Sequence, residues 1–100
     1  MDPEQSDLTI ADVVISTAGR DAGSLFYVLE ADETFLYLAD GKGRRIEKPK
    51  RKKRKHTSKV LRSETRVAEK LRLGDKVLNS ELRTDLEEII QTMQSNNLGG

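Results

Sequence analysis

The first half of the chain alternates short apolar segments with polar turns, a pattern that predicts β-strands. Residues 8–18 are dense in β-branched side chains, which favour a pleated strand over a helix. Two more strands are expected at 25–30 and 34–39, joined by the polar turn 31–33. Each of these two strands carries large apolar side chains at alternate positions, so we expect one set to face a shared interior. That set consists of Phe26, Val28, Phe35 and Tyr37.

Glycine-rich turns connect the predicted strands. Gly19 and Gly23 bracket the loop AGRDAG, where a positive φ or a close backbone approach is expected. The Asp-Gly pair at 40–41 is a hairpin signal that predicts a fourth strand at 44–47, and a fifth strand at about 56–61 would complete the set. Short strands joined by turns, without helical crossovers, predict a small antiparallel barrel, since closure removes exposed strand edges.

After residue 61 the apolar residues recur every three or four positions, which predicts two helices. The first helix is expected to begin with Ser63 as its N-cap and to stop at Gly74. The second helix is capped by Asn79 or Ser80 and carries an apolar stripe that should dock on the first helix, on the barrel or on a partner. The stripe consists of Leu78, Leu82, Leu86, Ile89, Ile90 and Met93.

The predicted fold class is therefore mainly β, with a barrel of about five strands followed by two short helices. Four regions are expected along the chain. They are a disordered acidic tail at 1–7, the barrel at 8–61, a helical extension at 62–95 and a loose tail at 96–100.

Charge is strongly segregated along this sequence. The chain as a whole has a net charge of +1, yet residues 41–62 hold twelve Lys or Arg and one Glu, a net charge of +11. The eight residues 48–55, KPKRKKRK, include seven cations and are called the basic run below. We expect the basic run to form a loop or the beginning of a strand, held between barrel strands. A polyanion responds to the local field and not to the total charge, so nucleic acid is the leading class of partner.

Several classes of function are disfavoured by composition. The 100 residues include no Cys, which excludes disulfides and thiol catalysis and favours a reducing compartment. No apolar segment approaches the roughly 18 residues of a membrane span, so an intracellular protein with no membrane partner is expected. His56 is the only His, and no nucleophile and base pair or phosphate loop stands out. We therefore expect no enzyme activity, no metal, no cofactor and no small-molecule substrate.

Four residues, Val14, Gly19, Gly23 and Val28, match the spacing of a KOW motif, the strand-loop-strand segment shared by several ribosomal proteins and transcription elongation factors. The longer string AGRDAG … LADGKGRRIEKPKRKKRKH, with AEKLRLGDKVLNSELR further on, resembles bacterial KOW-domain RNA-binding proteins related to the large-subunit ribosomal protein family fourteen of archaea and eukaryotes. The resemblance covers about residues 10–90. It implies an SH3-like barrel that contacts RNA through its loops and basic extensions.

The interpretation that follows is a non-catalytic RNA-binding protein of the cytoplasm, associated with the ribosome through large-subunit ribosomal RNA. Ribosomal proteins or a translation factor are further candidate partners. The basic run would lie along a phosphate backbone, and a double-stranded RNA groove suits recognition by charge and shape. The candidate RNA-binding residues are Arg20, Lys42, Arg44, Arg45, Lys48, Lys50, Arg51, Lys52, Lys53, Arg54, Lys55 and Lys59, with Gly19 and Gly23 shaping their loop.

Other interpretations stay open at this point. KPKRKKRK also fits a nuclear import signal or an inert solvated tract. Arg20 could simply pair with Asp21, and Tyr27 and Tyr37 could stack on bases or fill the barrel. A second function is a protein-interaction adaptor of the elongation-factor or ribosome-factor type, which would use the barrel and the C-terminal amphipathic helix. A nuclear chromatin or elongation role is a third.

Overall fold

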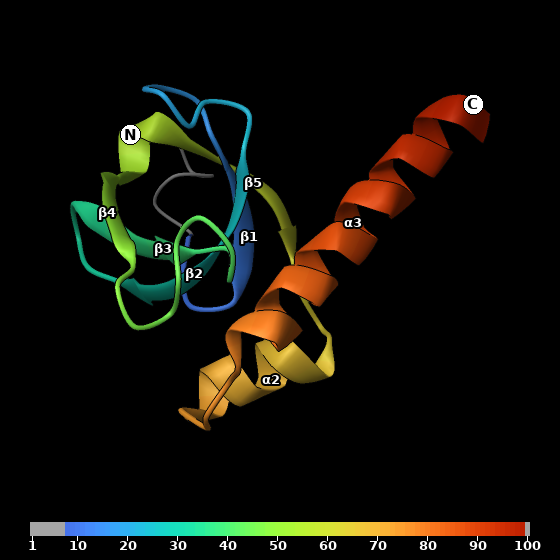
Figure 1. Ribbon diagram of the computed structural model, residues 1–100. Coiled ribbons are helices and arrows are strands. Elements are labelled where there is room, and N and C mark those ends of the chain that lie inside the picture. The colour runs from blue at the N-terminus through green and yellow to red at the C-terminus, as the bar shows by residue number, and fades with distance from the viewer. Residues whose placement is uncertain (1–7, 100) are drawn as a thin grey trace.

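Five strands form one antiparallel sheet in the order β4-β3-β2-β1-β5 in the computed structural model, which describes residues 8–99 (Figure 1). The strands are β1 (Asp12–Ser16), β2 (Leu25–Ala31), β3 (Phe35–Ala39), β4 (Lys50–Lys53) and β5 (Thr57–Arg62), with the one-turn 3-10 helix η1 (Arg54–His56) before β5. This arrangement confirms the small antiparallel barrel followed by helices. The predicted tail at 1–7 lies outside the described residues.

Two hydrophobic clusters lie on opposite faces of the sheet. The interior of the barrel is filled by Val14, Phe26, Val28, Leu36 and Leu38, together with Leu8. The second cluster joins the outer face of β1 and β2 to the C-terminal helices, and includes Val13, Tyr27, Ala39, Val67, Ala68, Leu82 and Leu86. Strand β2 is therefore buried on both faces, because its alternate side chains enter different clusters.

The predicted interior of β3 is wrong by one position. Leu36 and Leu38 are fully buried in the barrel, whereas Phe35 and Tyr37 are only partly buried and belong to neither cluster. A shift of one residue exchanges the two faces of a strand. The two β3 aromatics consequently lie on the outside of the sheet.

The predicted fourth strand at 44–47 is also wrong. Residues 40–44 do make a tight turn, in which Asp40 N–H and Gly41 N–H both donate to the Arg44 carbonyl. The chain then continues as a loop, because Ile46 N–H donates to the Asn79 side chain at 2.8 Å and not to β3. Pairing with β3 begins at Lys50, so the fourth strand lies inside the basic run itself.

Helix α2 (Arg66–Leu73) lies directly after β5. Its N-cap is Thr65, whose hydroxyl accepts from Ala68 N–H at 3.2 Å, and not the predicted Ser63. Ser63 is buried and its hydroxyl instead bonds to Tyr27. The helix ends at Gly74, as predicted, with a left-handed φ of 75°.

Helix α3 (Asn79–Gly99) is longer than the sequence predicts, since it continues through most of the expected loose tail. Leu82 and Leu86 bury its first half against the barrel and α2. Its second half projects away from the barrel (Figure 1), and residues 91–94 are all exposed. The predicted docking of the apolar stripe is thus confirmed for the first half of the helix.

Candidate nucleic-acid interface

The basic run has two structurally different sets of cations, because β4 turns alternate side chains inward and outward. Lys52 is 8% exposed, and its ammonium donates to the Asp21 carboxylate at 2.6 Å and to the Ala18 carbonyl at 2.7 Å. Lys50 reaches the other Asp21 oxygen at 2.8 Å. These two lysines tie β4 to the β1–β2 loop.

The Asp21 carboxylate at the centre of this contact is held in its charged form. Burial alone would raise its pKa, but hydrogen bonds from Lys50, Lys52 and Ser16 outweigh burial and hold the pKa well below its ordinary value. A carboxylate with three donors is a structural anchor for the loop. It also neutralises much of the charge of the two inward lysines.

Two further predicted RNA-binding residues hold the barrel together. Arg54 donates from Nε to the Asp32 carbonyl at 2.7 Å and from Nη1 to the Leu8 carbonyl at 2.9 Å. Lys59 lies 3.7 Å from the buried carboxylate of Asp12. We call Lys50, Lys52, Arg54 and Lys59 the inner cations.

The outward positions of the basic run are exposed and lie on the side of the barrel that is far from α3 (Figure 1). Arg51 places its guanidinium over the Phe35 ring, 4.5 Å from the ring centroid. We call the exposed residues Lys48, Arg51, Lys53 and Lys55 the outer cations. They are available to a partner, since the fold engages the alternate positions instead.

The loop at 41–49, which precedes β4 in the chain, carries three more exposed cations. The Asp40 carboxylate accepts from Lys42 N–H at 2.9 Å and from Arg44 N–H at 2.8 Å, which fixes the turn. The side chains of Lys42, Arg44 and Arg45 are left exposed. These three predicted residues are close to the outer cations in sequence.

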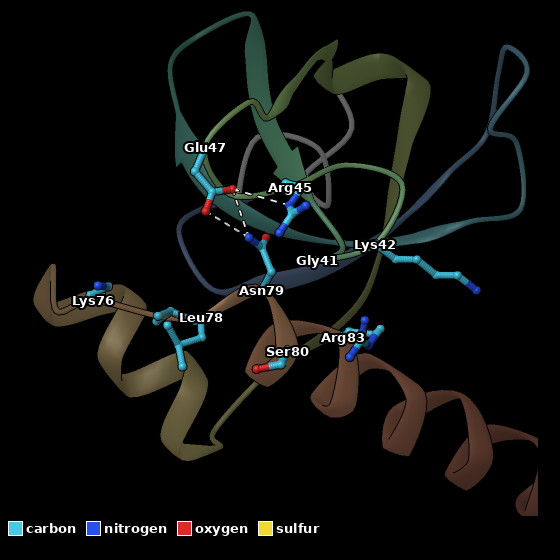
Figure 2. A pocket seen from close by; sticks show the side chains of 10 residues that line it. Gly41, Lys42, Arg45, Glu47, Lys76, Leu78, Asn79, Ser80 and Arg83 are labelled. Atoms are coloured by element: carbon cyan, nitrogen blue, oxygen red, sulfur yellow. Dashed lines mark hydrogen bonds and ion pairs between the residues drawn. The ribbon is translucent and has the colours of Figure 1, made fainter.

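Gly41 locks this loop onto α3. It is buried with φ of +78°, and a Cβ at this position would lie 2.1 Å from the Asn79 carbonyl oxygen. The Asn79 side chain also donates to both oxygens of Glu47, at 3.0 and 2.9 Å, which holds the pKa of Glu47 below its ordinary value (Figure 2). The position of the basic loop therefore depends on the docked helix.

A hollow of about 510 Å³ separates the loop from the α2–α3 connection. Four cations line it: the predicted Lys42 and Arg45, and Lys76 and Arg83, which sequence reasoning missed (Figure 2). No local signal marks Lys76 and Arg83, because their position beside the loop depends on the close packing of Gly41 against α3. The hollow is therefore bordered by these four cations together with Glu47, and Lys42 also lies beside Leu86 and Ile90 of α3.

The AGRDAG loop has the predicted geometry. Gly19 and Gly23 adopt φ of 86° and 91°, and Ala22 N–H and Gly23 N–H close the turn onto the Gly19 and Ser16 carbonyls. Arg20 is exposed, and it is Lys50 and Lys52 that pair with the neighbouring Asp21. Arg20 is thus brought beside β4.

Tyr27 cannot stack on a base, because it is fully buried beneath the helices. Its hydroxyl donates to the Asp85 carboxylate and bonds to Ser63 at 2.7 Å, while Thr65 donates to the same Asp85 oxygen at 2.8 Å. Burial, and then the bond to Asp85, raises the pKa of Tyr27 to about 12. This polar network fixes α3 on the sheet.

No protein-family model matches this sequence, and no curated protein matches it either. Among the residues that the structure describes, no helix is long and apolar enough to cross a membrane. The same part of the chain contains no group of three or more His, Asp or Glu placed to hold a metal ion.

Proposed function

We propose that this protein is a non-catalytic RNA-binding module whose outer cations contact the phosphate backbone. The observation that carries the proposal is the alternation along β4. Lys50 and Lys52 are used by the fold, whereas Arg51 and Lys53 are presented to solvent from a strand with a fixed backbone. A rigid row of cations binds a polyanion with less loss of conformational entropy than a flexible tract.

The wider charge distribution supports the same function. The exposed cations of the 41–49 loop come just before β4 in the chain. Arg20 is the neighbour of Asp21, which forms an ion pair with Lys52 of β4. Phosphate contacts of this kind contribute a large affinity that does not depend on base sequence. The resemblance to KOW-domain proteins makes ribosomal RNA, and so a cytoplasmic ribosome, the preferred partner within this class.

Paired charge-removing variants test the proposal. Lys53→Gln/Lys55→Gln removes two outer cations, and Arg62→Gln/Arg66→Gln removes two exposed cations from the β5 end and α2. We expect the first variant to weaken binding to a structured RNA about tenfold or more at low salt, and the second to change it by less than about threefold. Equal losses in both variants would reject a specific role for the basic run.

A protein-interaction adaptor is the second candidate, favoured by the projecting half of α3. Ile90 and Met93 remain 36% and 38% exposed there. Co-purification of a protein that survives nuclease and high salt, and that is lost in an Ile90→Gln/Met93→Gln variant, would support the adaptor. Loss of every partner after nuclease treatment would count against it.

A further inference from the structure

The outer face of β3 carries two half-buried aromatic side chains beside the outward cations of β4. Phe35 and Tyr37 alternate with the buried Leu36 and Leu38, so both point out of the barrel. The chain has only four aromatic residues, and the other two are buried. Phe35 and Tyr37 therefore do not serve either hydrophobic cluster.

The register of β3 and β4 brings these aromatics directly opposite the outward cations. Phe35 pairs with Lys53, and Tyr37 pairs with Arg51. Side chains opposite one another on the same face of an antiparallel pair lie about 5 Å apart at Cβ. Four side chains from two strands thus form one continuous patch of two rings and two cations.

The contact between Arg51 and Phe35 gives this patch a flat surface. The guanidinium lies 4.5 Å from the ring centroid, and a planar guanidinium held on one ring can in turn stack on a nucleobase. A lysine in place of Arg51 would supply the same charge but no planar group for stacking. The arrangement is typical of surfaces that combine stacking with phosphate contacts.

Negative charge limits the patch on one side. Glu30 pairs across β2 and β3 with Tyr37, and Asp32 and Glu33 form the β2–β3 turn next to Phe35. A polyanion should avoid that side and follow β4 toward the basic loop at 41–49. The bound strand would then have its bases over β3 and its phosphates along β4.

We propose that Phe35, Tyr37 and Arg51 form a stacking surface for unpaired bases, so that the protein binds single-stranded RNA in preference to duplex. The inference rests on the proposed RNA-binding function and specifies its ligand. Bases inside an A-form duplex are stacked on one another and cannot reach such a surface. A single strand can place its bases there at little conformational cost.

The test compares a short oligouridine with an abasic oligomer that has the same number of phosphates. Binding is measured for the wild-type protein, for Phe35→Leu/Tyr37→Leu and for Arg51→Lys, which keeps the charge but loses the planar group. We expect the wild type to bind oligouridine about 5-fold to 100-fold more tightly than the abasic oligomer. Both variants should bind oligouridine less tightly and the abasic oligomer unchanged.

Equal binding of the two oligomers by the wild-type protein would overturn the stacking surface and leave the phosphate contacts standing. Tighter binding to a duplex of the same length would overturn it as well. Failure to bind either oligomer or the duplex would overturn the RNA-binding function itself. If Phe35→Leu/Tyr37→Leu does not fold, as judged by circular dichroism, Arg51→Lys alone decides between these outcomes.

Discussion

Lys52, in the middle of β4, donates to the Asp21 carboxylate of the β1–β2 loop at 2.6 Å. The pair joins segments that are 31 residues apart, and Lys52 is only 8% exposed. A lysine from the most basic segment of the chain is therefore part of the folded framework. Its neighbours Arg51 and Lys53 face outward and are exposed, and this contrast with Lys52 allows stability and binding to be separated.

Lys52→Met should lower the free energy of unfolding by about 1–3 kcal/mol, because Asp21 loses a buried charged partner. Lys53→Met, one residue along and exposed, should change it by less than about 0.5 kcal/mol. Urea denaturation of both variants measures the difference. A loss for Lys53→Met as large as that for Lys52→Met would contradict the assignment of inner and outer cations.

Acid should weaken the same contact. The pKa of Asp21 is depressed in the folded protein, so its stabilising contribution is complete above its ordinary value of 3.8 and is lost as the pH falls below that value. Asp21→Asn should be less stable than the wild type at neutral pH, and the difference should shrink as the pH is lowered from about 4 toward 2. Thermal unfolding across this pH range measures the difference in stability between wild type and variant. A difference that does not change with pH would count against the pairing of Asp21 with the two lysines.

Alkali should act on a different contact, the buried Tyr27 hydroxyl. Its pKa is raised to about 12 from 10.0, so the stability that neutral Tyr27 confers is complete below pH 10 and declines between pH 10 and 12. Tyr27→Phe should lower the free energy of unfolding by about 1–3 kcal/mol at neutral pH, because the Asp85 carboxylate loses a hydrogen-bond donor. The difference between wild type and variant should narrow above pH 10 in urea denaturation experiments. A difference in unfolding free energy that stays constant from neutral pH to pH 12 would contradict this assignment.

Gly41→Ala should displace the first turn of α3. The added Cβ would lie 2.1 Å from the Asn79 carbonyl oxygen, at a residue whose φ is +78°. Backbone strain and the steric clash together should lower the free energy of unfolding by about 2–5 kcal/mol. Gly43→Ala, two residues later, meets no atom closer than 3.9 Å and should be nearly neutral. Hydrogen exchange should report faster exchange at the start of α3 in the first variant alone.

Local signals in the sequence predict part of this fold. The glycines at 19, 23 and 74 mark turns that require positive φ, and the change of apolar period at about residue 61 marks the beginning of the helices. Such features depend on a few neighbouring residues and on backbone sterics. They suffice for four of the five strands, β1, β2, β3 and β5, and for the two helices.

Long-range contacts account for what the sequence does not predict. A run of seven cations in eight residues is typical of a solvated segment. Lys50 and Lys52 become inward positions of a strand through the pairing of β4 with β3 and through their contacts with Asp21. The inward side of β3 depends in the same way on register, since Phe35 and Leu36 are equally apolar in sequence. The sequence therefore does not show which of the twelve candidate cations hold the barrel together and which face solvent.

The most direct test is the salt dependence of RNA affinity for the wild type and for Arg51→Gln/Lys53→Gln. Each lost phosphate contact should reduce the slope of log affinity against log salt by about 1, so we expect a slope shallower by about 2 in the variant, with unfolding free energy changed by less than about 1 kcal/mol. An unchanged slope, with the variant folded, would contradict the account.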